Sequence, residues 1–227
     1  MDGTALDEDA VAYLSSDRFV DSDNPIVIAF AERIAGEAET NVEKARRLFY
    51  AVRDEIYYDP YTVWGSPDSY RASTCIEARR GFCIPKAAVM AAAARALAIP
   101  ARVGYSDVRN HLATPRLLEL MGTDVFTWHG FTELHLDGRW VKVTPTFNKS
   151  LCKKFGVKTL EFDGYNDSIL HPFDNDNRRH MEYVSNRGVY TDVPFEAIIA
   201  TFQEKHPEMY AKGHGVEGDF QNEAGAS

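Results

Sequence analysis

An alanine-rich segment between Cys83 and Ala98 places the strongest constraint on how this chain can fold. Alanine is the best helix former, and its small side chain lets neighbouring elements approach a helix closely. Pro85 falls in the first turn, where the missing N–H group costs nothing, and Pro100 stops the helix. We therefore predict a closely packed helix from Cys83 to Ala98, with Cys83 at its N-terminus.

Two helices are predicted upstream of this segment. The first begins at Pro25, which follows a polar turn, and continues to Ile34. The second begins after Thr40, because Thr40 and Glu43 have the spacing of a capping box. Apolar residues then recur every three or four positions as far as Ile56, a pattern that indicates one buried helix face.

A β-hairpin is predicted downstream of the alanine-rich segment. Its two strands run from Val125 to Leu136 and from Arg139 to Thr144, and their side chains alternate in character. The dipeptide Asp137-Gly138 between them is a strong signal for a two-residue turn. A further strand is expected from Ala101 to Tyr105.

The segments after the hairpin are predicted to add further strands and a last helix, and together they indicate the fold class. Met181 to Tyr190 resembles a second hairpin that turns at residues 186–188, and Phe195 to Phe202 is expected to form a helix. Helices come first and strands follow, an order that favours an α+β fold over a doubly wound sheet. We predict one domain over residues 1–210 and a flexible tail over residues 211–227.

Composition excludes several classes of function. Lys and Arg number 25 and Asp and Glu 34, and the resulting charge of −9 disfavours binding to nucleic acid or to an anionic membrane. Three cysteines are too few for a disulfide framework and too far apart for a tight metal site, so we expect no metal and no cofactor. Residues 1–10 contain no Lys or Arg and do not resemble a secretory signal, which favours a cytoplasmic protein.

Cys83 is the candidate nucleophile. A thiol at a helix N-terminus lies at the positive end of the helix dipole, which favours the reactive thiolate. Its backbone N–H group can also donate to an oxyanion. Cys75 and Cys152 lie at no such clear helix start, and we interpret them as buried structural thiols.

His129 is the candidate base. Alternate residues of a strand share a face, so His129, Phe131 and Glu133 are expected to point together. Trp128 is expected to point the other way, into the core. A histidine in a strand becomes a plausible base when the fold brings it to a cysteine at a helix start.

Four sequence blocks in this order resemble the core of the transglutaminase-like superfamily. The blocks are Gly81-Phe-Cys83, then Ala98-Ile-Pro-Ala-Arg102-Val-Gly104, then His129-Gly-Phe-Thr-Glu133, and finally Asp137-Gly-Arg-Trp140-Val with Thr144-Pro-Thr146. The resemblance covers about residues 40–148 and implies a papain-like core, in which a nucleophile helix packs on an antiparallel sheet that carries the base. Arg102 and Glu133 match family positions and are interpreted as structural, either as a buried ion pair or as a contact at the end of a strand.

The sequence departs from this family at the third catalytic position. Thr144 stands where the family has an Asp that orients the histidine. We expect Thr144 to contact His129 weakly, through its hydroxyl or through a water, and replacement by Val to lower the rate by about tenfold to a hundredfold. Alternatively, Asp163, Asp167 or Asp174 supplies the missing acid.

The resemblance implies a cysteine-dependent acyl enzyme, and a hydrolase that cleaves an amide or another activated carbonyl through a Cys83 thioester is the leading interpretation. Its substrate would be a small molecule or a peptide. One alternative is a metabolic enzyme of the same fold that carries out acyl transfer or cleaves a carbon–carbon bond of a diketone-like compound. Another is a scaffold that binds without catalysis. The sequence leaves open the substrate, the acyl acceptor and the oligomeric state.

Six aromatic residues gather in the matched region and just after it. They are Tyr105, Phe126, Trp128, Phe131, Phe147 and Phe155. The simplest interpretation is that they pack the core. An aromatic-walled pocket is the alternative, and it would suit a compact aromatic or diketone substrate better than a polypeptide.

Overall fold

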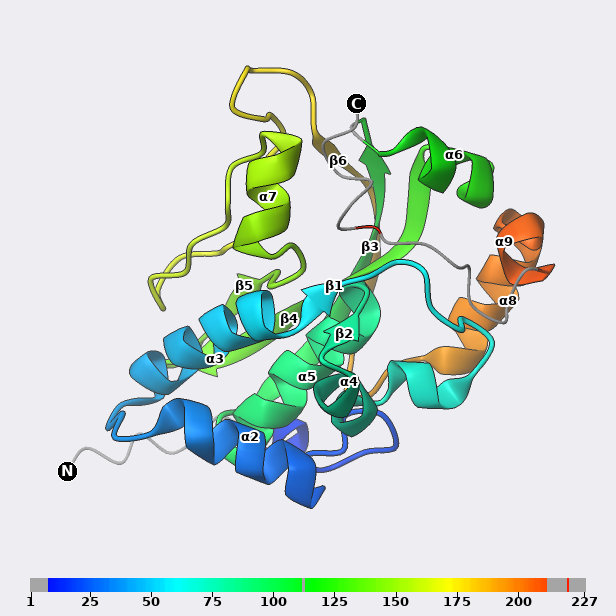
Figure 1. Ribbon diagram of the computed structural model, residues 1–227. Coiled ribbons are helices and arrows are strands. Elements are labelled where there is room, and N and C mark those ends of the chain that lie inside the picture. Colours follow the sequence, from blue (N-terminus) through cyan, green and yellow to red (C-terminus); the bar gives the residue numbers. More distant parts are fainter. Residues whose placement is uncertain (1–7, 112, 212–219, 221–227) are drawn as a thin grey trace.

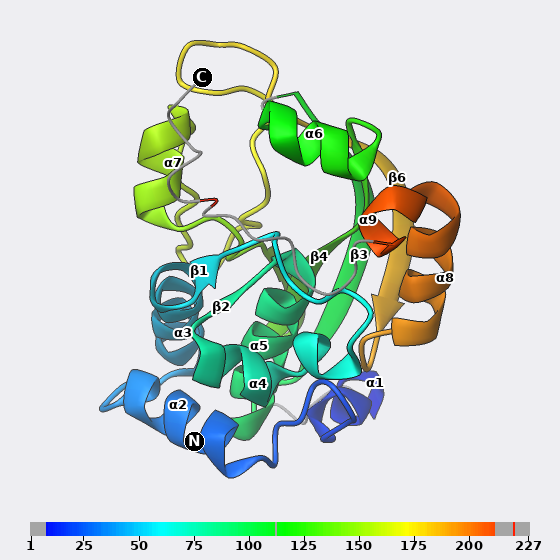
Figure 2. The same ribbon diagram turned by 45° about the vertical axis from the view of Figure 1, so that its right-hand side comes forward.

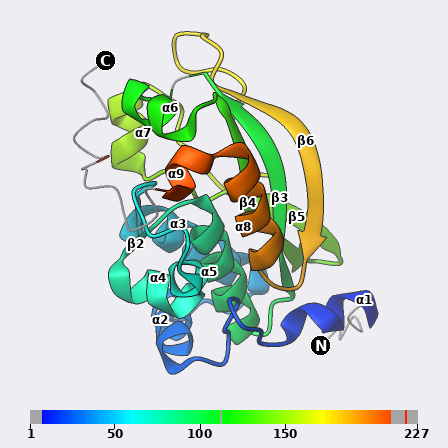
Figure 3. The ribbon, with the colours of Figure 1, turned by 90° about the vertical axis from the view of Figure 1, so that its right-hand side faces the viewer.

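The protein is built around an antiparallel sheet that carries helices. In the computed structural model, which describes residues 8–111, 113–211 and 220, the strands lie in the order β5-β4-β3-β6. Their bounds are Ala101–Asn110 for β3, Val125–Leu136 for β4, Arg139–Val143 for β5 and Met181–Tyr190 for β6. Neighbouring strands are antiparallel, and most helices lie to one side of the sheet (Figure 3). The predicted α+β class is confirmed.

Helix α5 (Cys83–Ala96) lies at the centre of the helical layer, and its residues from Ile84 to Arg95 are all buried. It packs on β3 and β4, and three other helices surround it (Figures 1 and 2). These helices are α2 (Pro25–Ala35), α3 (Asn41–Glu55) and α4 (Ala72–Ala78). The alanine side chains permit close packing on several sides at once. The helix ends two residues before the predicted Ala98, which has a left-handed φ of 59°.

The two ends of α3 explain how the chain reaches the start of α5. At its N-terminus, Thr40 and Glu43 form both hydrogen bonds of the predicted capping box. After its C-terminus, strand β1 (Tyr57–Tyr58) pairs in parallel with β2 (Arg80–Gly81). The residues that follow α3 therefore lie beside the residues that precede Cys83.

Strand β6 corrects the prediction of a second hairpin. Met181–Tyr190 is one continuous strand that pairs with β3 along its length, except at the two bulged residues Val184 and Arg187. The sequence Asn186-Arg187-Gly188 forms a bulge in place of a turn: the register shifts there, and Gly188 has a φ of 90°. The Asn186 side chain accepts a hydrogen bond from the Gly188 N–H at 2.9 Å. The bulge directs Arg187 toward the carboxylate of Asp107, an interaction that a local turn signal does not reveal.

Shorter helices complete the described chain. They are α1 (Glu8–Val11), α6 (Pro115–Met121), α7 (Lys149–Phe155), α8 (Phe195–Lys205) and α9 (Pro207–Ala211), with 3-10 turns at Ala12–Leu14 and Pro67–Tyr70. Of the predicted tail, Ala211 ends α9 and Phe220 is buried, while its other residues lie outside the described part of the chain. Among the described helices, none is long and apolar enough to cross a membrane.

Candidate active site

Cys83 is the first residue of α5, and it lines a pocket inside the molecule. Phe82 precedes the helix without a side-chain capping bond, so the first N–H groups of the helix remain available. The backbone N–H groups of Gly130, Ile84 and Cys83 favour the thiolate, but burial has the larger effect and raises the pKa of Cys83 to about 11. The thiol is therefore protonated at neutral pH, in contrast to the preformed thiolate expected from the helix dipole alone.

Strand β4 passes very close to the start of α5. A Cβ atom on Gly130 would lie 3.0 Å from the carbonyl oxygen of Cys83 and 3.1 Å from the Cα atom of Ile84. Glycine permits this approach of two backbones because it has no side chain. Since Gly130 directly follows His129, the contact brings the imidazole and the thiol to the same pocket.

His129 lines this pocket from β4 and is only 5% exposed. Burial lowers the pKa of His129 to about 4, so the imidazole is neutral at pH 7. Its Nε2 atom has no hydrogen-bond partner among the residues that the structure describes. A neutral imidazole of this kind can accept a proton from the thiol.

The backbone changes direction immediately before His129. Trp128 has a φ of 60°, and the register between β3 and β4 shifts beside it. The indole Nε1–H donates a hydrogen bond to Thr201 of α8 at 2.9 Å, and the ring packs edge-on against Tyr105 with centroids 5.5 Å apart. Trp128 belongs to the core, as predicted, and its conformation sets the direction from which His129 enters the pocket.

Thr144 directly follows β5 and is 1% exposed. Its hydroxyl has no hydrogen bond of ordinary geometry within the described ranges, although it lies close enough to the Tyr183 phenol to oppose the effect of burial on the pKa of that phenol. A direct hydrogen bond between the Thr144 hydroxyl and Nε2 of His129 is therefore absent, and a contact through a water stays a prediction. The Thr144 backbone N–H donates to the carbonyl of Ser168 at 2.9 Å, which fixes this residue against the loop that follows α7.

None of the three aspartates proposed as substitutes lines the pocket, although the Asp174 carboxylate acts on His180, which does. Each of the three is bound to its own surroundings. Their partners are Asn166 for Asp163, the Lys142 backbone for Asp167, and Arg178 for Asp174. No described carboxylate opposes the effect of burial on the pKa of His129. In the described part of the chain, the thiol and the imidazole thus line one pocket, and no acid acts on the imidazole.

Aromatic side chains form much of the pocket wall. They include Tyr58, Trp64, Phe82, Phe126, Phe147 and Phe155. The prediction of core packing therefore holds for Tyr105, Trp128 and Phe131, whereas Phe126, Phe147 and Phe155 line the pocket. Within the described ranges, no group of three or more His, Cys, Asp or Glu side chains is arranged to hold a metal ion.

Most of the residues that line the pocket were not proposed as part of the site from the sequence, and Trp64 and His180 are two of them. Trp64 comes from the loop between β1 and α4, and His180 directly precedes β6. Both lie far from Cys83 in sequence, and no motif marks them.

Arg102 and Glu133 form the ion pair that the sequence predicted, with 2.6 Å between nitrogen and oxygen. They are direct partners across the β3–β4 pair. The guanidinium also lies 4.0 Å from the ring centroid of Trp140. Neither Arg102 nor Glu133 lines the pocket of Cys83, which supports a structural role.

The comparisons with known proteins agree with this architecture. Residues 28–145 match the transglutaminase-like superfamily, and because this is just over half of the chain, the protein belongs to that superfamily. The solved structure of a proposed cysteine protease from Cytophaga hutchinsonii is similar in fold, with a TM-score of 0.55 and 19% sequence identity over 87% of this chain. This chain covers 52% of that protein, or about half its length. Among curated proteins, no sequence matches this one.

Proposed function

We propose that this protein is a cysteine-dependent hydrolase that cleaves an amide or another activated carbonyl through a thioester on Cys83. The observation that carries the proposal is the presence of a thiol, a neutral imidazole and backbone N–H donors in one largely apolar pocket. Membership of the transglutaminase-like superfamily supports cysteine-dependent acyl chemistry in general.

The first half of the reaction forms the thioester. His129 accepts the thiol proton while the sulfur of Cys83 attacks the substrate carbonyl, and a carbon–sulfur bond forms. The carbonyl oxygen becomes an oxyanion, which the backbone N–H of Cys83 at the start of α5 stabilises. The tetrahedral intermediate then expels the leaving group, which takes the proton from His129.

The second half releases the acyl group. Water attacks the thioester carbonyl and gives a proton to His129, and collapse of the intermediate breaks the carbon–sulfur bond. The acid leaves, the sulfur recovers the proton from His129, and the free thiol is restored. Because both groups begin neutral, the charges on thiolate and imidazolium develop only during the reaction.

Intact mass spectrometry tests this mechanism. The protein is mixed with a panel of p-nitrophenyl esters and p-nitroanilides, quenched rapidly, and examined for an acyl adduct on Cys83. Cys83→Ala should abolish both adduct and turnover, and His129→Ala should abolish turnover. Cys75→Ala and Cys152→Ala are matched controls that should retain activity. Turnover by Cys83→Ala, or an adduct on another residue, would exclude the proposed nucleophile.

A further inference from the structure

The lining of the pocket beyond Cys83 would exclude many carbonyl compounds that the proposed chemistry could otherwise use. Its described lining contains no Asp, Glu, Lys or Arg side chain. A charged substrate group would lose its hydration there without gaining a partner, which is costly in an apolar environment. Most lining side chains are themselves buried, including Trp64 at 3% and Met209 at 1% exposed. A folded polypeptide cannot lie along such a wall, whereas a small molecule can enter it.

The sheet gives the length of the pocket. His129 pairs with Ser106 on β3, and Met181 pairs with Asn110 further along the same strand. His129, Asn110 and Met181 all line the pocket. Four residues separate Ser106 from Asn110, which is about 13 Å at the usual rise of a strand. The pocket therefore accommodates an elongated group, of the length of a medium acyl chain or a phenylalkyl chain.

His180 lies at the end of the pocket away from Cys83. It directly precedes β6 and is 7% exposed, and its ring centroid lies 6.4 Å from that of Phe147. Burial lowers the pKa of His180 to about 4, so its imidazole is neutral at pH 7. A neutral imidazole offers one hydrogen-bond donor and one acceptor to an uncharged polar group.

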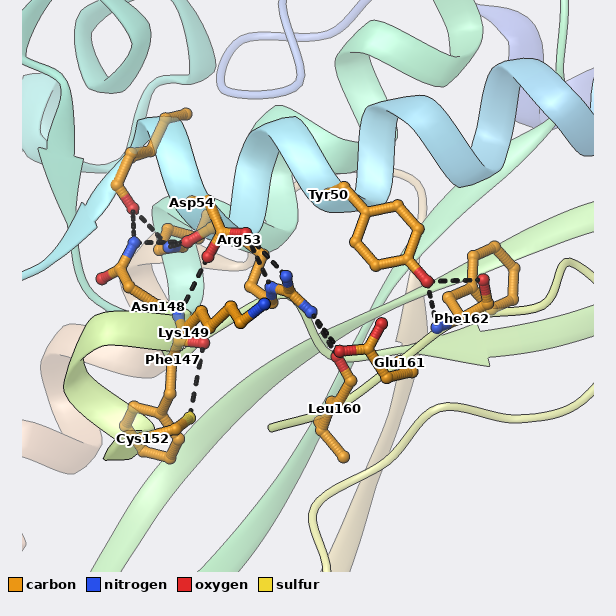
Figure 4. A network of polar contacts seen from close by, with 12 residues as sticks. Tyr50, Arg53, Asp54, Phe147, Asn148, Lys149, Cys152, Leu160, Glu161 and Phe162 are labelled. Atoms are coloured by element: carbon orange, nitrogen blue, oxygen red, sulfur yellow. Dashed lines mark hydrogen bonds and ion pairs between the residues drawn. The ribbon is translucent and has the colours of Figure 1, made fainter. Parts of the chain in front are cut away.

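The wall that carries Phe147 is held in place by polar contacts to α3 (Figure 4). The Asn148 side chain donates to the carbonyls of Arg53 and Ile56, and it accepts the N–H of Tyr58 at 2.6 Å. The Lys149 N–H donates to Asp54 at 2.9 Å. Phe147 and the ring of Tyr58 are therefore positioned before a ligand enters, with ring centroids 4.9 Å apart in an edge-to-face arrangement.

We infer that the site takes a compact, uncharged arylalkyl acyl group, with its carbonyl at Cys83 and its ring extended between the aromatic side chains toward His180. This inference rests on the proposed function, because it assigns the carbonyl to Cys83. Aromatic walls favour a ring through edge-to-face and offset contacts. His180 favours a ring that carries a neutral hydrogen-bonding substituent such as a phenol hydroxyl.

Calorimetric titration of the Cys83→Ala variant tests the inference without requiring catalysis. 4-Phenylbutanamide should bind at least tenfold more tightly than 4-phenylbutanoate, 4-phenylbutylammonium, acetamide or an acetylated tetrapeptide amide. It should also bind more tightly than octanamide. The inference is overturned if either charged compound or the peptide binds as tightly, and the preference for a ring is overturned if octanamide binds more tightly.

The contribution of His180 is tested on the same background. 4-(4-Hydroxyphenyl)butanamide should bind more tightly than 4-phenylbutanamide, and His180→Phe should remove this difference. The matched control is His135→Phe, because His135 is also buried and packs against an aromatic ring but lies outside the pocket. Equal loss in both variants, or no loss in His180→Phe, would exclude the contact.

The binding results separate this inference from the proposed function. Tight binding of 4-phenylbutanamide together with no turnover of arylalkyl esters by the unmodified protein would refute the proposed hydrolysis and leave the pocket assignment intact. Turnover of acetyl or peptide substrates together with weak binding of every arylalkyl amide would refute the pocket assignment and leave the proposed hydrolysis intact.

Discussion

The carboxylate of Asp107 accepts a hydrogen bond from the backbone N–H of Trp128, with 3.1 Å between Oδ1 and N. Trp128 has a left-handed φ of 60°, a conformation that costs a bulky residue about 1–3 kcal/mol. Arg187 and Ser185 each donate a hydrogen bond of 2.9 Å to Oδ2 of the same carboxylate, so its position is fixed from β6. Because His129 is the next residue, Asp107 helps to determine where the imidazole lies.

Replacement of Asp107 is therefore expected to lower the catalytic rate by more than any loss of folded protein would explain. Asp107→Ala should lower kcat/KM toward an arylalkyl ester by at least about tenfold, an increase in barrier of about 1.4 kcal/mol, because the imidazole is no longer aimed at the thiol. Asp107→Asn should recover part of the loss, since its amide oxygen can still accept the Trp128 N–H. The loss should appear mainly in kcat, with KM little changed.

The control for this prediction is Asp192→Ala. Asp192 also accepts backbone N–H groups in a partly buried place, from Phe19 and Val20, but it does not contact the β3–β4 irregularity. This variant should lower the melting temperature and leave kcat per folded molecule unchanged. Equal effects of the two substitutions on kcat would show that Asp107 has only a structural role.

The pH dependence of Cys83 alkylation should distinguish a neutral pair from a preformed ion pair. Burial raises the pKa of the Cys83 thiol to about 11 and lowers that of His129 to about 4, so little thiolate exists at pH 7. In a background with Cys75 and Cys152 replaced by Ala, the iodoacetamide rate should rise about tenfold per pH unit between pH 7 and 9. A rate that is already constant from pH 5 upward would contradict this expectation.

Thr144→Val should have almost no effect on turnover, in contrast to the tenfold to hundredfold loss expected from the sequence. The Thr144 hydroxyl is buried without a hydrogen bond among the described residues, so Val removes an unsatisfied group of similar shape. The free energy of unfolding, measured with urea, should be unchanged or higher by up to about 1 kcal/mol.

Thr132→Val provides the comparison for Thr144→Val. The Thr132 hydroxyl is equally buried but donates to the carbonyl of Ala87 in α5 at 2.9 Å. Its loss should reduce the free energy of unfolding by about 1 kcal/mol. If Thr144→Val reduces kcat by tenfold or more while the protein remains folded, the hydroxyl acts on His129 after substrate binds.

Local signals and tertiary burial account for the success and failure of the sequence predictions. Helix α5 and the hairpin at Asp137-Gly138 were predictable because alanine content and turn chemistry act over a few residues. The segment Asn186-Arg187-Gly188 has the same local signal for a turn and for a bulge, and its pairing with β3 decided the outcome. The positions of Cys83 and His129 in one pocket followed the family pattern. The protonated state of Cys83 could not be predicted from that pattern, because it depends on burial that only the folded chain creates.

Lys86 should make the stability of this protein rise with pH. Its ammonium group lies one turn after Cys83, is completely buried, and donates to the carbonyls of Arg53 and Ile56 at the end of α3. Burial lowers the pKa of Lys86 to about 7 from the ordinary value of 10.5. The unfolded chain therefore binds more protons than the folded chain between these values, and the free energy of unfolding increases with pH across this window.

Urea unfolding at pH 7, 8 and 9 measures this effect. Lys86 should contribute a rise of about 2–3 kcal/mol over this range, at up to about 1.4 kcal/mol per pH unit. From about pH 8 upward the three cysteines offset part of this gain, because burial raises the pKa of Cys75 to about 12 and of Cys83 and Cys152 to about 11, so that ionisation of these thiols favours the unfolded chain. Lys86→Met should remove the rise, whereas the exposed Lys205→Met should retain it. A rise that persists in Lys86→Met would mean that Lys86 remains charged in the folded protein.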